Sequence, residues 1–248
     1  YESDVVQHLK SSWSANVAID KAFSENEIQD DQLRMMFSCC HPQISQDSQV
    51  ALTLKTLCGL NLAEIAQAFL CSQESVKKRL VRARQALKNG DVEFEIPEGS
   101  DLEVRLSSVL ETLFLVFNEG YHSFLGKKTL RQELCFEAIR LCKLLASHSG
   151  FENKDSIYAL MALMQFNGSR FNARFDKENT PISLEFQNRS LWDAKLILLA
   201  IQNLSLAMKT DALTEYHILA AISAQHCTSP TYKGTHWETI RSLYSSLA

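Results

Sequence analysis

A run of basic side chains lies between Ser72 and Lys88, where the sequence reads SQESVKKRLVRARQALK. Lysine and arginine side chains bind phosphate oxygens and the edges of nucleobases, so this run could recognise an anionic polymer. Its single acidic residue, Glu74, stands near the beginning. A solvated surface helix usually mixes both signs of charge at a spacing of three or four residues. Because acidic residues do not balance the basic ones here, the pattern favours a nucleic-acid site. A solvated basic face is the alternative.

Placed on a helix at 100° per residue, this run has an apolar and a basic face. The apolar stripe consists of Val76, Leu80, Ala83 and Leu87. The residues predicted to contact DNA lie outside it, and they are Ser75, Lys77, Lys78, Val81, Arg82, Arg84 and Lys88. The first four could meet base edges or a thymine methyl group, and the last three suit phosphates. Arg79 borders the stripe, and we expect it to pair with Glu64 or to stack within the motif.

The preceding segment predicts the elements that would position this helix. An apolar helix follows Ser45 and ends before Gly59, which can close it. Asn61 and Glu64 then match a capping box at the start of a short helix, AEIAQAF. After a tight connection, Ser72 can cap the basic helix. Two short helices joined by about four residues, the second one cationic, form the outline of a helix-turn-helix, whose second helix enters the major groove.

The basic helix stands in a chain whose overall net charge is −4, so the remainder of the chain is acidic. Directly after it, Asp91, Glu93 and Glu95 alternate with apolar residues. An extended chain would place these three acids on one side. We interpret the segment as a linker docked by its apolar side, with competition between these acids and DNA phosphates as the sharper hypothesis.

From residue 100 onward the pattern is helical. A capping box at Ser100 opens an apolar helix, and further helices are predicted near 130–147, 156–171, 191–208, 215–227 and 236–247. Their expected caps are Thr129, Asp155, Ser190, Thr214 and Thr235. A short strand is expected near residues 182–186. We therefore predict an all-α protein with a connector (1–30), a helix-turn-helix domain (31–90), an acidic linker (91–100) and a larger helical domain (101–248). The paired helices of this last domain resemble the start of a helical-repeat array.

The larger helical domain contains polar groups but no catalytic motif. The candidates are Glu119, His122, Asp193, His217 and His226. None lies in a nucleophile elbow, a metal-ligand helix or a phosphate loop, so neither an enzyme nor a cofactor is predicted. Glu119 follows an apolar helix, where a carboxylate needs a partner, and Arg189 is the expected one. A structural ion pair is the preferred interpretation of these two residues, and a regulatory contact surface is the second.

Cysteine usage and hydropathy limit where the protein acts. The seven cysteines show no paired framework, so we expect reduced and mostly buried thiols. Cys39, Cys40 and His41 cluster, but adjacent ligands seldom reach one metal, and no metal site is predicted. No apolar run approaches the roughly 18 residues of a membrane span, and no signal-like segment opens the sequence. We expect a cytoplasmic protein without a membrane partner.

Residues 51–88, ALTLKTLCGLNLAEIAQAFLCSQESVKKRLVRARQALK, resemble region 4 of the sigma-70 family, in its extracytoplasmic-function type. The segments FSCCHP, FNEGYHS, NRSLWD and YHILAAISAQH are similar to a subgroup with a long carboxy-terminal helical extension. The chain begins too late to contain region 2, which melts the −10 element in such factors, so we expect that it cannot initiate transcription alone.

The resemblance implies a transcription initiation factor that binds core RNA polymerase at its flap and reads the −35 promoter element in the major groove. Carried over by position, Lys77, Lys78 and Val81 would face bases, and Ser75, Arg82 and Arg84 would face the DNA backbone. The extension would modulate activity in response to a regulatory protein or ligand. The alternative is a helix-turn-helix transcriptional regulator with a ligand- or protein-binding helical domain.

Overall fold

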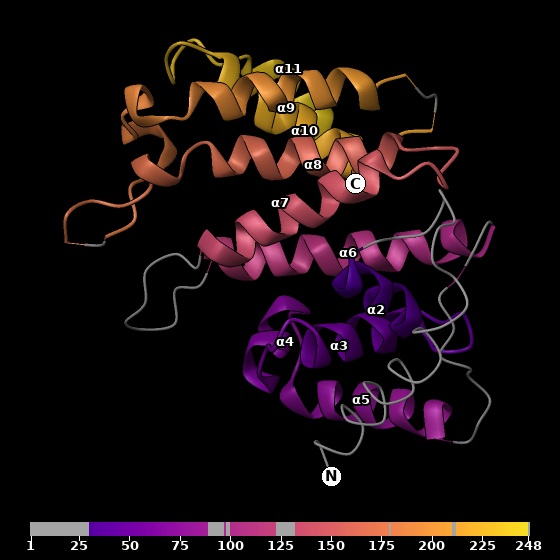
Figure 1. Cartoon of the computed structure of the whole chain (residues 1–248). Coiled ribbons are helices and arrows are strands. Elements are labelled where there is room, and N and C mark those ends of the chain that lie inside the picture. Colours follow the sequence, from indigo (N-terminus) through magenta and orange to yellow (C-terminus); the bar gives the residue numbers. More distant parts are fainter. Residues whose placement is uncertain are drawn as a thin grey trace. The chain divides into compact units, whose positions relative to one another are not determined.

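The computed structural model describes residues 30–88, 97, 100–122, 132–178, 180–209 and 212–247. Within these ranges the chain is all-α, which confirms the predicted fold class (Figure 1). The helices are α2 (Asp31–Cys39), α3 (Gln46–Thr56), α4 (Leu62–Ala68), α5 (Gln73–Lys88), α6 (Ser100–His122), α7 (Gln132–Ser147), α8 (Asp155–Gly168), α9 (Ala194–Ala207), α10 (Glu215–Thr228) and α11 (Trp237–Ser245). Three 3-10 turns are η1 (Phe171–Ala173), η2 (Leu184–Phe186) and η3 (Arg189–Leu191).

Two predicted segments lie largely outside the described residues. They are the connector at 1–30 and the acidic linker at 91–100, including Asp91, Glu93 and Glu95. The strand expected near residues 182–186 is wrong, because η2 occupies Leu184–Phe186 and the extended pairing there is a single bridge between Phe175 and Pro181.

The protein divides into two compact units, and the boundary lies within helix α6. The first unit holds the described residues up to Val116 together with Ser147–Glu152. The second holds the described residues of 117–146 and 153–248. The first part of α6 therefore belongs to the same unit as the helix-turn-helix, whereas our predicted domain boundary places all of α6 in the larger helical domain.

Local signals start and end the helices of the first unit. Asp30 caps α2 by accepting from the backbone N–H groups of Gln32 and Leu33, both at 3.1 Å. The chain leaves α3 through Gly59, whose φ of +68° is readily adopted by glycine. Asn61 Oδ1 accepts from Glu64 N at 3.0 Å, and the Glu64 carboxylate accepts from Asn61 N at 2.6 Å. The predicted capping box at the start of α4 is confirmed.

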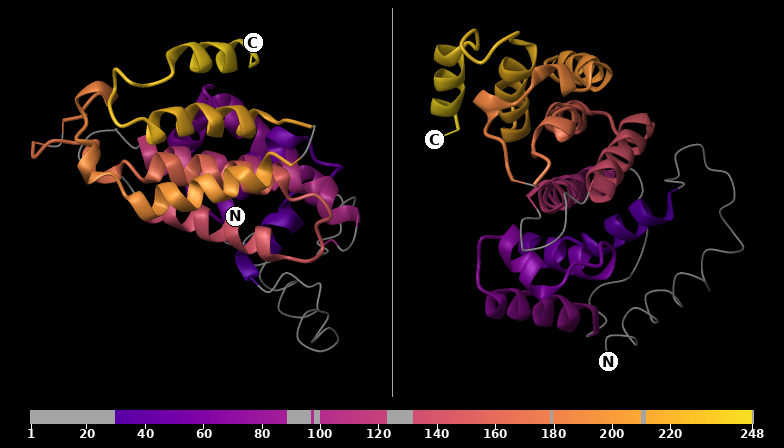
Figure 2. Two further views of the ribbon diagram at one scale, coloured as in Figure 1. Left: turned by 90° about the horizontal axis from the view of Figure 1, so that it is seen from above. Right: turned by 90° about the vertical axis from the view of Figure 1, so that its left-hand side faces the viewer.

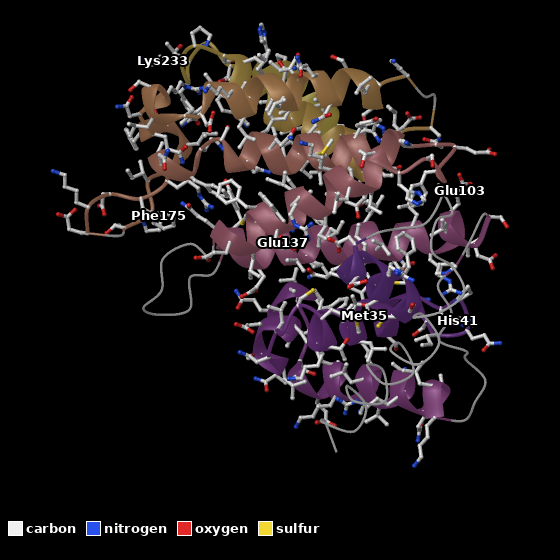
Figure 3. All side chains as sticks on the ribbon, viewed as in Figure 1. Met35, His41, Glu103, Glu137, Phe175 and Lys233 are labelled. Carbon is white, nitrogen blue, oxygen red and sulfur yellow. The ribbon has the colours of Figure 1, made fainter. Side chains whose placement is uncertain are left out.

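Helix α6 and the Ser147–Glu152 segment join the first unit through polar and aromatic contacts. Arg105 is buried and donates from Nη1 to the carbonyl of Phe37, at 3.1 Å. The Phe37 ring stacks with that of Phe151, with centroids 6.1 Å apart. Glu103, labelled in Figure 3, accepts from the backbone N–H of Glu152 at 3.1 Å. Because Glu103 binds this distant backbone, α6 and the Ser147–Glu152 segment complete the fold around α2.

Helix α8 is the centre of the second unit. Its side chains Ile157, Leu160, Met164 and Phe166 are buried, and α9 and α10 pack against it, with α11 on α10 (Figure 2). An apolar helix that is buried on nearly all sides needs neighbours all round, which explains the long apolar run in this part of the sequence.

Three of the caps predicted for this unit differ in the structure. Asp193, and not Ser190, caps α9 by accepting from the N–H groups of Lys195 and Leu196. The N-cap of α8 is Lys154 rather than Asp155, and that of α11 is His236 rather than Thr235. Several polar residues near each helix start could form the cap, and tertiary contacts decide among them. Thr214 does occupy the N-cap of α10, as predicted.

His217 closes the start of α10 from a buried position. Its Nδ1 accepts from Thr214 N at 3.0 Å, and its Nε2 lies 3.2 Å from the carbonyl oxygen of Ala207. Burial lowers the pKa of His217, so the imidazole is neutral where the unfolded chain would already bind a proton. The sign follows from linkage: its contribution to stability is present above the unfolded pKa and is lost as pH falls below it.

We expect the wild-type chain to lose more stability than a His217→Gln variant when the pH is lowered from 7.5 to 5.5. Glutamine can accept the same capping bond but does not titrate, so the difference isolates His217. One such group adds a slope of at most about 1.4 kcal/mol per pH unit. Urea unfolding at several pH values measures it, and parallel curves for the two proteins would contradict the assignment.

Candidate nucleic-acid interface

The apolar stripe of α5 is buried within the first unit, as predicted. Val76, Leu80 and Ala83 are buried, and Leu87 is half-buried against the cluster formed by Cys39, Ile44, Leu52 and Ala83. Helix α5 packs on α3 and α4 (Figure 1). Buried methyl and methylene groups along one face fix the rotation of the helix about its axis. The basic residues on the other side are thereby held outward.

A tight turn between α4 and α5 sets the direction of the basic helix. Leu70 adopts a φ of +50° with its side chain in solvent, and Cys71 N donates to the carbonyl of Ala66 at 2.9 Å. The Ser72 hydroxyl accepts from Ser75 N at 3.2 Å, so the predicted cap of α5 is confirmed. The two helices and this turn form the predicted helix-turn-helix.

The seven residues predicted to contact DNA differ in exposure. Lys77, Lys78, Val81, Arg82 and Lys88 are exposed, whereas Ser75 and Arg84 are half-buried. The hydroxyl of Ser75 lies 3.0 Å from that of Ser72, and the Nε atom of Arg84 is buried without a hydrogen-bond partner.

Charge and polarity are unevenly distributed over this exposed face. Lys77 pairs with Glu74 at 3.9 Å, but both side chains are largely in solvent, where such a pair is weak. Val81 is 50% exposed in the middle of a cationic surface. An apolar side chain there does not help solvation, but it can contact a thymine methyl group in the major groove.

Arg79 is a structural residue that the sequence left ambiguous. Its guanidinium pairs with Asp47 on α3 at 2.8 Å and lies 4.6 Å from the ring centroid of Phe69. The predicted stacking within the motif is confirmed, but the predicted partner Glu64 is wrong, since that carboxylate caps α4. Arg79 therefore ties α5 to its two neighbours and is already neutralised.

We expect Arg79→Ala to lower the free energy of unfolding by about 1 kcal/mol, because a half-buried ion pair and a cation–π contact are lost. The dependence of DNA affinity on salt should stay unchanged, since an arginine engaged within the protein releases few DNA counterions. Thermal unfolding and binding at several salt concentrations test both parts. A reduced salt slope in this variant would mean that Arg79 contacts phosphate.

Comparison with known protein families identifies the domain that contains these helices. Residues 34–87 match the model of sigma-70, region 4. The chain contains a sigma-70 region 4 domain. Residues 105–208 match a family of unknown function, DUF6596. The chain is 37% identical over 218 residues to an uncharacterized protein of Rhizobium meliloti (strain 1021), covering 88% of this chain and 51% of that protein, so it spans about half of its relative's length. No solved structure matches the chain.

The region 4 domain is structurally larger than its sequence match. The match ends at residue 87, and the DUF6596 match begins at Arg105 within α6. The unit that contains α5 nevertheless includes α6 as far as Val116, and Arg105 itself donates to α2. The unit that carries the basic face thus includes residues that match the other family.

In the larger helical domain, Arg189 does not form the ion pair predicted with Glu119. Arg189 donates to the carbonyls of His226 and Ser229, at 2.6 and 2.9 Å, and its guanidinium lies 4.4 Å from the Trp192 ring centroid. The expectation that Arg189 pairs with the buried Glu119 is therefore wrong. The last carbonyls of α10 lack partners within the helix, and an arginine side chain is well suited to bind them. The sequence pattern contained no signal for this contact.

The remaining polar candidates and the cysteines form no metal site among the described residues. The described residues include no group of three or more His, Cys, Asp or Glu side chains placed to hold a metal ion. Burial raises the pKa of the Cys39 and Cys58 thiols to about 12 each, which makes them poor nucleophiles. His41, labelled in Figure 3, accepts from Gln43 N through Nδ1 at 3.3 Å. In the described part of the chain, no helix has the length and apolarity that crossing a membrane requires.

Proposed function

We propose that this chain is the promoter-reading and regulatory part of a transcription initiation factor of the extracytoplasmic-function type. In this role α5 enters the major groove of the −35 element, and the region 4 domain contacts the flap of core RNA polymerase. The observation that carries the proposal is the exposed cationic face of α5, with Val81 at its centre, within a sigma-70 region 4 domain. The protein then acts in the cytoplasm, without catalysis of its own.

The exposures of the side chains support a division of labour along α5. Lys77, Lys78 and Val81 are exposed on the first turns, where the recognition helix meets base edges. Arg82 and Lys88 are exposed further along and suit phosphates, which orient the protein on the duplex. Ser75 and Arg84 are half-buried and suit contacts to the DNA backbone at the edge of the interface.

The larger helical domain supplies the regulatory part of the proposal. Its long helices offer surfaces for a regulatory protein or ligand. The relative from Rhizobium meliloti is about twice as long as the matched region, so the proposed grip on core polymerase requires testing in the longer protein. Co-purification of the full-length protein with core polymerase, in competition with a housekeeping sigma factor, separates this function from that of an ordinary helix-turn-helix regulator.

Selection from a pool of short random duplexes at two salt concentrations tests the DNA-reading function of the chain itself. We expect enrichment of one short motif, and an affinity that falls steeply with salt, by a slope of about 0.9 for each phosphate contact. Enriched duplexes also supply the −35 sequence that this helix reads. Absence of any enriched motif, with equally weak binding to all duplexes, would contradict the proposal.

A further inference from the structure

Three arginines gather in the second unit, along the segment that leaves α8 and leads to α9. Arg170 donates from Nη2 to the hydroxyl of Tyr121 at 2.9 Å and to Asn167 Oδ1 at 2.6 Å. Arg174 donates from Nη1 to the carbonyl of the same Tyr121 at 2.7 Å, and its guanidinium lies 3.5 Å from the ring centroid. Two guanidinium groups thus converge on one tyrosine.

The third guanidinium, that of Arg189, is held by the end of α10, within electrostatic range of Arg170. Arg189 donates to the last carbonyls of that helix. Ser169, next to Arg170, joins both neighbouring segments: its carbonyl accepts from Asp193 N at 2.8 Å, and its hydroxyl lies 3.9 Å from the Cys227 sulfur. Arg170 and Arg189 therefore lie at one junction of α8, η3 and α10. The Arg174 guanidinium lies 5.6 Å from the ring centroid of Phe175, which Figure 3 labels.

Among the described residues, no carboxylate pairs with the positive charges of this cluster. Every contact of the three guanidinium groups within the described residues is to a neutral partner, namely a hydroxyl, an amide oxygen, backbone carbonyls or aromatic rings. Two of their donors, Arg170 Nε and Arg189 Nη2, are buried without a hydrogen-bond partner, as is Nδ1 of His226. Partly buried charges in proteins are normally paired, and buried donors are normally bonded.

The charges also act on one another. Burial lowers the pKa of Arg174, and the neighbouring positive charge of Arg170 lowers it further. Burial and Arg170 have the same effects on the pKa of Arg189. Burial, followed by the charges of Arg170 and Arg189, lowers the pKa of His226. The carbonyl end of α10 compensates only part of the charge of Arg189. A bound anion would relieve this repulsion and satisfy the unbonded donors.

We propose that Arg170, Arg174 and Arg189 form a binding site for a phosphate group. A phosphate carries close to two negative charges and several acceptor oxygens, and the planar fork of a guanidinium matches its geometry. A single carboxylate would leave most of the positive charge unbalanced. The occupant is inorganic phosphate or the phosphate of a small phosphomonoester, and its binding stabilises the junction of α8, η3 and α10 against unfolding. This site is independent of the DNA-reading face.

The test is titration of the 248-residue chain with inorganic phosphate and, separately, with glycerol 3-phosphate, at constant ionic strength balanced with chloride. Calorimetry gives Kd, and thermal unfolding gives Tm. At ten times Kd, a ligand that binds one site on the folded chain should raise Tm by roughly 3 to 6 °C. Binding of the phosphomonoester alone would assign the site to the phosphate of a larger molecule, and binding of both would assign it to phosphate as such.

Two variants and one control make the test specific. Arg170→Gln should weaken Kd at least about tenfold, because one charged donor group is lost. Arg174→Lys keeps the positive charge but loses the planar guanidinium, and it should weaken binding less than Arg170→Gln does. Arg241→Gln removes an exposed arginine of α11 paired with Glu238 and should change neither value. Helix content by circular dichroism confirms that each variant folds.

The proposal is overturned by either of two results. One is absence of binding heat and of any Tm change with both probes in the wild-type chain. The other is an equal rise in Tm for wild type and a folded Arg170→Gln variant, which would show general salt stabilisation of the protein.

Discussion

Replacing Lys77 and Lys78 together by alanine is expected to lower affinity for the selected duplex by about 10- to 100-fold, while Tm changes by less than about 1 °C. Both side chains are exposed on the first turns of α5, and Lys77 has only a weak surface pair with Glu74. Their removal leaves no cavity and no buried unpaired group, so the fold loses little. The expected loss of affinity therefore comes from contacts of these two lysines with DNA.

The matched control is Lys195→Ala with Lys209→Ala, which removes two exposed lysines from the second unit and keeps the net charge equal to that of the first variant. Binding of both variants to the selected and to a scrambled duplex separates base reading from general attraction. A loss confined to the selected duplex indicates base contacts, and an equal loss on both duplexes indicates phosphate contacts. Equal affinity of wild type and the Lys77/Lys78 variant for the selected duplex would exclude these lysines from the interface.

Replacing Arg105 by alanine should destabilise the first unit by about 3 kcal/mol. The side chain is 6% exposed, and its Nη1 atom donates to the carbonyl of Phe37 at the end of α2. Truncation leaves a cavity between α6 and α2 and a buried carbonyl that has lost a charged donor. DNA affinity should fall only at temperatures or urea concentrations at which the unit begins to unfold.

Arg140→Ala is the matched control for this prediction. Arg140 lies on α7 and pairs with Glu137 at 2.7 Å, but both side chains are at least about a third exposed, so its loss should cost less than about 0.5 kcal/mol. Hydrogen exchange of peptides from α2 and α6 at increasing urea concentrations reports the first unit separately. A loss below about 1 kcal/mol for Arg105→Ala would show that α6 contributes little to that unit.

Local patterns predicted much of the fold and of the basic face. The stripe through Val76 and Leu80 and the capping box of Asn61 and Glu64 depend on residues within one or two helical turns, so periodicity and spacing suffice to find them. The exposure of Val81 was predicted by the same placement of residues at 100° intervals around the helix axis. These features are confirmed because the local preferences and the tertiary packing agree.

Contacts between distant residues could not be predicted in this way. Arg79 had a nearby carboxylate, Glu64, but Asp47 on another helix is its partner. Arg105 stands between acidic residues in the sequence, and only the fold shows it buried against Phe37. Arg189 lacked any local sign that it would bind the end of α10. Long side chains reach whichever acceptor packing brings close, and one sequence does not specify that acceptor.

The discontinuous make-up of the first unit has a consequence for biosynthesis. The Phe151 ring stacks on Phe37, and the backbone N–H of Glu152 donates to Glu103. The last contacts of this unit are therefore made by residues that are translated well after α5. Residue 152 follows Lys88 by 152 − 88 = 64 positions. At about 5 to 20 residues per second, the ribosome needs roughly 3 to 13 seconds to add them. During that interval the basic helix emerges before its scaffold is complete, and the nascent chain cannot yet present a fully formed DNA-reading surface.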